Sequence, residues 1–334
     1  MEPDSTTFDE SSKVNLPFVV NPGNLKVYSM LSSNDTEKCI ESQIVMKLQN
    51  FGLLPKTIRC TTNKPDCRMV CKTTRVIDRV QWCCEGCGKR QPIRYGSFFL
   101  RLQCSLLQVL QMILAWCEDA DCNMAAESFG VKPKVAITIY DKLDELAVKE
   151  HKNTKLGGEN SVVLAEMYPN CLNRFSPDTT DHPHVHRVLM LADTKHIPTH
   201  YKLHVIQDDL KKQLVSSGDG QSLQKEIEEV VSRVTEPESL VVTSSNVPHI
   251  EGAATMQQLA QHCDADMIQF LSSRIWRQAV SLCSASRDLC APGASPLCGA
   301  AQAYLHAALY RRQLGDGFYG QLLRVIARNH THDS

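Results

Sequence analysis

The chain has 334 residues, of which 43% are hydrophobic and 22% are charged, and its formal net charge at pH 7 is −1. This length and apolar content suffice for one substantial core and a smaller one, so we expect two or three folded units. The near-zero charge excludes a global electrostatic attraction to nucleic acid, and any such binding must come from a local basic patch.

The sequence contains no charged start followed by an apolar stretch and no run of 18 apolar residues. It therefore predicts neither a secretory signal nor a membrane span, and we expect an intracellular protein. In that setting the fifteen cysteines should be reduced thiols, some of them binding metal, rather than a disulfide framework.

The first predicted elements are a leader and a short helix. Residues 1–35 are polar and show no sustained period, which predicts a mostly disordered leader. Thr36 is a candidate cap for the helix that follows, and Gly52 is its stop. The apolar face of this helix consists of Ile40, Ile44, Val45 and Leu48.

A basic, cysteine-rich segment comes next, within the predicted unit 36–103. Residues 56–103 hold eleven Lys and Arg against three Asp and Glu, a local net of +8, with strand-like pieces at 75–77 and 91–95. Zinc prefers four tetrahedral ligands, and two thiolate pairs can supply them while stapling a segment too small for a core of its own. The segment therefore predicts a zinc ribbon.

The proposed ligands of a structural Zn²⁺ come from two pairs of cysteines. Cys84 and Cys87 form a CxxC knuckle, and Cys60 and Cys67 are the choice for the second pair. Cys71 could replace either Cys60 or Cys67. Four thiolates and one Zn²⁺ together subtract two charges, so the ribbon would still carry about +6 by formal counting.

Residues 104–152 predict a helix-turn-helix-like unit. A wide apolar helical face is followed by a turn at Gly130 and by a third helix from about Pro133 to Lys149. Residues 104–150 carry four Lys and Arg against eight Asp and Glu, a net of −4, which is poor for neutralising phosphates. The face consists of Leu106, Leu107, Leu110, Ile113, Leu114 and Trp116.

The remainder of the chain predicts an α/β domain over residues 157–330. Residues 152–160, with Gly157 and Gly158, are typical of a linker. Strands followed by helices indicate a sheet closed by a helical tail. The strand candidates are 161–165, 184–192, 201–206 and 239–243, and the helix candidates are 221–234, 254–262, 266–280, 299–313 and 317–329.

Several motifs in this order resemble those of the Merlin transposases and their bacterial ISXO2-like relatives. Trp82-Cys83-Cys84 with Cys87, and then the stretch 93–99, resemble the amino-terminal half of that family. Residues 161–168, 236–243 and 276–279 resemble the surroundings of its three catalytic acids, and the likeness covers about residues 50–330. The resemblance implies an RNase H-like fold with two Mg²⁺ held by three carboxylates.

The three acidic positions implied by the resemblance are occupied here by Ala165, Ser244 and Ser273. A methyl group cannot ligate a cation, and two hydroxyls lack the charge that offsets the dehydration of Mg²⁺. Glu166, one residue along the predicted strand, should direct its side chain to the opposite face of the sheet. We therefore expect no Mg²⁺ site and no strand cleavage.

The leading hypothesis is a domesticated, catalytically inactive transposase relative that binds DNA or chromatin in the nucleus. An alternative is a scaffold for protein partners without DNA affinity, motivated by the −4 balance of residues 104–150. A second alternative is an active DDE transposase. The predicted phosphate contacts are Lys89, Arg90, Arg94 and Arg101 in the ribbon, with Lys132 and Lys134 at the start of the third helix.

Overall fold

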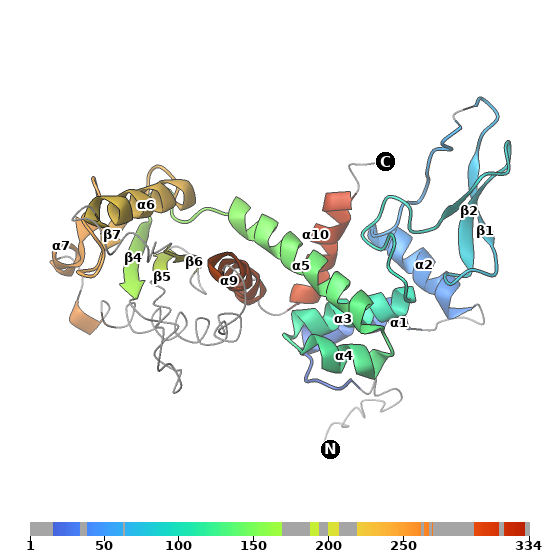
Figure 1. Ribbon diagram of the computed structural model, residues 1–334, viewed down its shortest axis with the longest axis horizontal. Coiled ribbons are helices and arrows are strands. Elements are labelled where there is room, and N and C mark those ends of the chain that lie inside the picture. Colours follow the sequence, from blue (N-terminus) through green and yellow to red (C-terminus); the bar gives the residue numbers. More distant parts are fainter. Residues whose placement is uncertain are drawn as a thin grey trace, which may run out of the picture. The chain divides into compact units, whose positions relative to one another are not determined.

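The computed structural model describes residues 16–33, 39–62, 64–168, 188–193, 200–206, 219–261, 264–266, 269, 297–313 and 317–330. The chain forms two compact units, one of residues Met1–Leu143 with Leu314–Ser334 and one of Asp144–Gln313. The first contains a small antiparallel sheet and helices, and the second contains a mixed five-stranded sheet with helices (Figure 1). The expected α/β class is thus confirmed at this coarse level.

Helix α1 (Pro22–Ser32) occupies part of the predicted leader, so the prediction of disorder is wrong from Pro22 onward. The Asn21 side chain caps the helix by accepting a hydrogen bond from the Gly23 N–H at 2.8 Å. Tyr28 is buried, and its ring contacts the Tyr319 ring with centroids 6.4 Å apart. Tertiary packing therefore stabilises this helix, and the polar composition of residues 1–35 gave no indication of that packing.

Helix α2 (Ile40–Phe51) matches the predicted short helix. Ile44, Val45 and Leu48 are buried, and Gly52 ends the helix in the left-handed conformation with φ of 88°. The proposed cap Thr36 lies outside the described residues, and the N-cap position is Cys39.

The ribbon is a three-stranded antiparallel sheet with the order β1-β2-β3. Residues 75–77, predicted as strand-like, instead form the turn between β1 and β2, where the Arg79 N–H donates to the Val76 carbonyl at 3.0 Å. Trp82 is buried in the middle strand. The strands are β1 (Met69–Thr73), β2 (Val80–Cys84) and β3 (Arg90–Pro92).

The predicted three-helix segment is present as α3 (Leu106–Cys117), α4 (Cys122–Phe129) and α5 (Pro133–Asn153). Ser105 and Gln108 form a reciprocal capping box at the start of α3, and Gly130 ends α4 with φ of 64°. Helix α10 (Phe318–His330), expected in the tail of the α/β domain, instead belongs to the first unit, where it contacts α1 and α3.

The sheet of the second unit has the order β6-β5-β4-β7-β8. Three consecutive strands pair antiparallel, whereas β7 lies parallel to β4 and β8 parallel to β7. The strands are β4 (Val162–Tyr168), β5 (Val188–Asp193), β6 (Tyr201–Val205), β7 (Leu240–Thr243) and β8 (Ala254–Thr255). The helices are α6 (Asp219–Val234), α7 (Met256–Ala260) and α9 (Leu297–Gln313).

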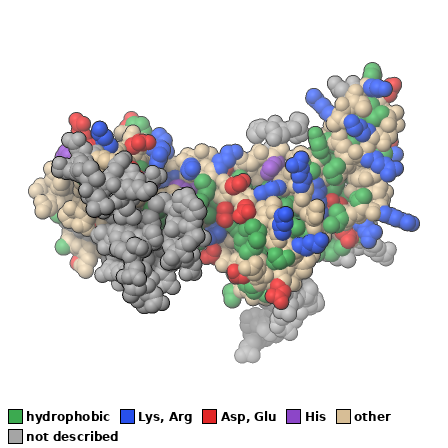
Figure 2. Space-filling model, in the orientation of Figure 1, with side chains coloured by type: hydrophobic (Ala, Val, Ile, Leu, Met, Phe, Trp, Pro, Cys, Tyr) green, Lys and Arg blue, Asp and Glu red, His purple; other side chains and the backbone are tan. Residues whose placement is uncertain are grey.

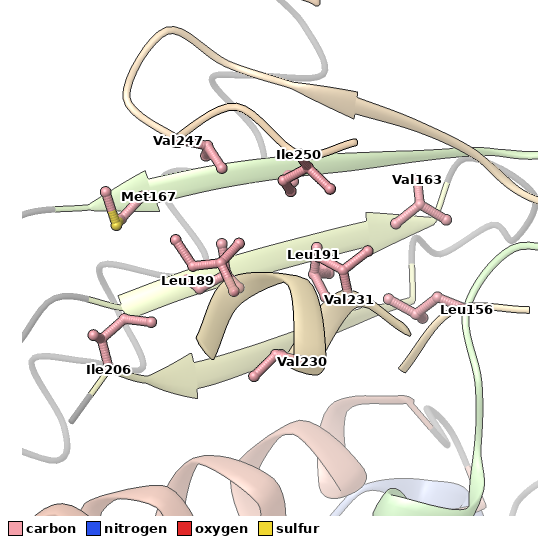
Figure 3. Close-up of a cluster of buried hydrophobic side chains, with 12 residues drawn as sticks. Leu156, Val163, Met167, Leu189, Leu191, Ile206, Val230, Val231, Val247 and Ile250 are labelled. Atoms are coloured by element: carbon pink, nitrogen blue, oxygen red, sulfur yellow. The ribbon is translucent and has the colours of Figure 1, made fainter. Parts of the chain in front are cut away.

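Hydrophobic side chains cover both faces of this sheet. On one face Leu189 and Leu191 pack with Val230 and Val231 of α6 (Figure 3). On the other face the alternate strand residues pack with Leu305, Ala308 and Leu309 of α9. All six residues of β5 are buried, as expected for a strand covered on both faces.

The edge strand β6 is covered by one side chain of α9. The Gln302 amide oxygen accepts from the Val205 N–H at 2.7 Å, and its Nε2 donates to the Leu203 carbonyl at 2.8 Å. This amide therefore satisfies two backbone groups that a neighbouring strand would otherwise bind.

The segment predicted as a linker is docked on the second unit. Leu156 is buried and bridges Thr235, and the Gly157 N–H donates to Asp193 Oδ2 at 2.8 Å. A Cβ on Gly157 would lie 2.0 Å from Ser239 Oγ, and φ at Gly157 is 86°. The glycine thus permits close backbone approach rather than flexibility.

Substitution of Gly157 by Ala should destabilise the second unit by about 2–4 kcal/mol, because the added methyl meets both left-handed strain and a steric overlap. Gly252→Ala is the matched control, because φ there is 76° but a Cβ would meet nothing within 4 Å. Chemical denaturation of both variants measures the difference. Equal losses of stability would show that the overlap contributes nothing.

Candidate metal centre and basic ribbon surface

Four cysteine thiols of the ribbon lie together. The Sγ atoms of Cys60, Cys67, Cys84 and Cys87 are all within 4.8 Å of one another. Tetrahedral Zn²⁺ with Zn–S bonds of about 2.3 Å would place sulfurs about 3.8 Å apart, so the cluster is consistent with a structural metal such as Zn²⁺. Cys71 lies on β1 and is exposed, outside the cluster.

The turn between β2 and β3 presents Cys84 and Cys87 through backbone hydrogen bonds. The Gly88 N–H donates to the Cys84 carbonyl at 3.0 Å, and the Cys84 N–H donates to the Lys89 carbonyl at 2.8 Å. A Cβ on Gly86 would lie 2.3 Å from the Asp66 carbonyl oxygen, in the loop that carries Cys67. Glycine at this position therefore lets the two ligand loops approach each other.

Thr62 is a contact of the cluster that sequence reasoning missed. Its Oγ1 lies 2.9 Å from the sulfur of Cys60, 3.1 Å from that of Cys67 and 3.3 Å from that of Cys87. Hydroxyls are common near any loop, so the sequence carried no signal for this role. The position allows Thr62 to donate a hydrogen bond to a thiolate.

The local hydrogen bonds favour thiolate at two of the four positions. The Thr62 hydroxyl and then the Lys89 N–H lower the pKa of Cys87 to about 6, and the Thr62 hydroxyl also lowers the pKa of Cys60. The Cys87 N–H lowers the pKa of Cys84, but burial and neighbouring thiols together raise it to about 11. Metal binding requires the deprotonated form, which a bound cation stabilises.

Several basic side chains lie on the face of the ribbon that Figure 2 shows. Exposed acidic residues in the same segment, over the positions that the structure describes, are Asp66 and Glu85. The positive excess of the sequence is therefore a property of the surface. The exposed basic residues are Lys56, Arg59, Lys64, Arg68, Lys72, Arg75, Arg79, Lys89, Arg90 and Arg101.

Arg94 is the exception, and its predicted phosphate contact is wrong. The residue is 4% exposed, and its guanidinium donates two hydrogen bonds to the carboxylate of Asp78, one of them at 2.7 Å. It also donates to the carbonyls of Leu102 at 2.7 Å and Cys104 at 2.8 Å. Arg94 thus joins the β1–β2 turn to the segment before α3, and its donors are used internally.

The other predicted phosphate contacts are exposed. Lys89 and Arg90 lie at the β2–β3 turn, and Arg101 precedes α3 with φ of 67°. Lys132 and Lys134 lie at the start of α5. Their side chains are therefore accessible, as contact with a phosphate backbone requires.

Two of the three positions that replace the expected acids are neighbours in the second unit. The Ser244 N–H donates to the Ala165 carbonyl at 3.0 Å across the paired strands β4 and β7. Ala165 is buried in the core covered by α6. Ser273 lies outside the described residues.

Glu166 lies closer to this position than predicted. Its Oε1 accepts hydrogen bonds from Ser244 Oγ at 2.8 Å and from Asn246 Nδ2 at 3.2 Å. Strand alternation does separate its side chain from that of Ala165, but Glu166 lies one residue beyond the last β4–β7 pair, so its side chain can reach the residues that follow β7. In the described part of the chain, the cysteine cluster is the one group of three or more side chains placed to hold a metal ion.

No family model, curated protein or solved structure matches the chain. Among the described residues, no helix combines the length and apolar character needed to cross a membrane.

Cys84→Ala should abolish stoichiometric zinc binding and unfold the ribbon, because three remaining thiolates cannot close a structural tetrahedral site. Cys71→Ala is the matched control and should leave zinc content unchanged, since this exposed thiol lies outside the cluster. Elemental analysis of the purified full-length protein measures both. Loss of zinc in the Cys71 variant would contradict the ligand assignment.

Arg94→Ala should lower the free energy of unfolding by about 3–5 kcal/mol, because it leaves the buried carboxylate of Asp78 without a partner. Arg90→Ala should change stability by less than about 0.5 kcal/mol, since that side chain is exposed. Urea denaturation monitored by tryptophan fluorescence separates the two. A mild effect at Arg94 would show that the pair is not structural.

Proposed function

We propose that the chain is a transposase-derived, catalytically inactive nuclear protein that binds DNA or chromatin through a zinc ribbon. The observation that carries this proposal is the basic surface surrounding the four-cysteine cluster. DNA affinity arises mainly from neutralised phosphates, and the ribbon supplies the strongest local positive charge in the sequence. The proposed contacts are now Lys89, Arg90 and Arg101, with Lys132 and Lys134 at the start of α5.

The second unit supports the RNase H-like part of the proposal. An RNase H-like sheet has three consecutive antiparallel strands, with the first of them parallel to the fourth strand beside it. Strands β4, β5, β6 and β7 have this arrangement. The support concerns topology alone, and the transposase origin rests on the motif resemblance.

The proposal of inactivity rests on the side chains at the paired strand ends. A two-metal mechanism needs several carboxylates converging on two cations. Ala165 offers a methyl group, and Ser244 offers a hydroxyl that is donated to Glu166. One carboxylate engaged in two hydrogen bonds supplies neither the charge nor the ligand number for two Mg²⁺.

A second candidate function is a protein-interaction scaffold without DNA affinity. The acidic balance of residues 104–150 favours it, because a helix-turn-helix unit that reads DNA would need basic residues. Recovery of a stoichiometric protein partner by the full-length chain, together with no DNA binding at low salt, would replace the leading proposal by this one.

Full-length protein should shift a duplex DNA probe at low salt, with an affinity that falls steeply as salt is raised. Substitution of both Lys89 and Arg90 by Gln should weaken binding and reduce the slope of log affinity against log salt by about 1.8, since each lost phosphate contact removes about 0.9. Lys26→Gln, an exposed change on α1, is the control.

Three other results would count against the proposal. An equal loss of affinity in the Lys26 variant would remove the ribbon as the contact surface. Retention of affinity after the ribbon zinc is stripped by a chelator would do the same. Mg²⁺-dependent nicking of the probe by purified protein would establish an active transposase instead.

A further inference from the structure

The second unit contains a cavity of about 370 Å³ that the proposed function does not use. It lies where the edge strand β6 meets α6, α9 and the end of α5. Part of its lining is apolar and comes from Leu189, Leu191 and Val230, which are labelled in Figure 3. The rest is dominated by nitrogen-bearing side chains from four different elements.

Three basic side chains line the cavity. Lys152 comes from the last turn of α5, Lys202 from β6 and Arg233 from the last turn of α6. Over the part of the chain that the structure describes, no Asp or Glu lines it. Lys202 is 5% exposed, and its Nζ donates to the Thr154 hydroxyl at 2.9 Å and to the His151 carbonyl, both of them uncharged partners.

Two histidines add to this lining. His204 Nε2 lies 3.0 Å from Glu226 Oε1, so this carboxylate is already paired with a histidine of the lining. His306 contacts Gln302 through Nε2 at 3.0 Å, while its buried Nδ1 has no hydrogen-bond partner among the described residues. One side chain of the lining therefore carries an unsatisfied polar atom, in addition to the basic groups.

The pKa directions agree with an uncompensated positive field. Burial, followed by the charges of Lys202, Lys152, His204 and Arg233, lowers the pKa of His306 to about 4. Burial lowers the pKa of Lys202 to about 8. The Lys202 shift reflects burial alone, whereas the His306 shift also reflects the neighbouring positive charges, and an entering anion would offset those charges.

Helix dipoles give a simpler reason for part of this pattern. Lys152 and Arg233 lie in the last turns of their helices, where cations are favourable. That reason does not cover Lys202, which is buried on a strand, or a cavity with an apolar wall. A ligand that combines negative charge with an apolar body accounts for all of these features.

We propose that this cavity binds a small phosphate monoester, with its phosphate among Lys152, Lys202 and Arg233 and its apolar or aromatic body against Leu189, Leu191 and Val230. A phosphate monoester carries nearly two negative charges at neutral pH and three strong acceptor oxygens. Arg and Lys are the side chains that bind such groups in charge-assisted hydrogen bonds. The site lies in a different unit from the ribbon and is independent of DNA binding.

Isothermal titration of the full-length protein with phenyl phosphate, in a buffer free of phosphate, should show one site per chain. Arg233→Gln and Lys152→Gln should each weaken binding about tenfold or more, the usual loss for one hydrogen bond to a charged group. Both side chains are exposed, so these variants should fold. Lys225→Gln, an exposed change on α6 that does not line the cavity, is the matched control.

Inorganic phosphate should bind more weakly than phenyl phosphate, because it leaves the apolar wall uncovered, and phenol should not bind detectably. Absence of phenyl phosphate binding would overturn the proposal, as would equal weakening in the Lys225 variant. Arg90→Gln should leave phenyl phosphate affinity unchanged, so failure of the ribbon to bind DNA and failure of this cavity to bind a phosphate are separate results.

Discussion

The ribbon depends on the convergence of four thiols from two separate loops. Trp82 is buried in the middle strand, whereas Cys67 and Cys87 of the ligand loops are partly or fully exposed, so apolar burial contributes less at those loops. Cys60 and Cys67 come from the loop before β1, and Cys84 and Cys87 come from the turn after β2. A cation shared by these thiols would join two loops that backbone hydrogen bonds alone would hold weakly.

A second constraint fixes the ribbon to the helices of its unit. The pair of Asp78 and Arg94 is buried, and the other ten basic residues of the segment are exposed. Because one acid and one base are buried together, the net positive charge of the exposed residues equals that of the whole segment. The ribbon is therefore attached to the rest of its unit through Arg94 and carries basic side chains on its surface, and the proposed DNA contact depends on both features.

Much of this arrangement followed from local patterns in the sequence. The CxxC spacing indicated the ligand loops, and the apolar periods of α2, α3 and α6 indicated helices close to their observed bounds. These features depend on residues near one another in the chain, where spacing determines geometry. Helix α1 was missed because it packs against other helices of its unit, including α10, whose Tyr319 lies nearly 300 residues away in the sequence.

The predictions for Arg94 and Gly157 failed for a different reason. The role of the Arg94 side chain is set by its partner Asp78, and the role of the Gly157 backbone is set by Ser239, which lies close to it in the fold. The local sequence around a basic residue in a basic segment is the same whether that residue is exposed or buried. The same holds for a pair of glycines between two predicted units. Burial is a property of the tertiary fold, so composition alone could not distinguish the two states.

The amide of Gln302 has a further consequence for the second unit. By binding both the Leu203 carbonyl and the Val205 N–H, it takes the place of an additional strand at the open edge of β6. A free edge is a template for intermolecular pairing and aggregation. One glutamine on α9 thus limits the growth of the sheet in that direction and helps to keep separate copies of the chain from joining edge to edge.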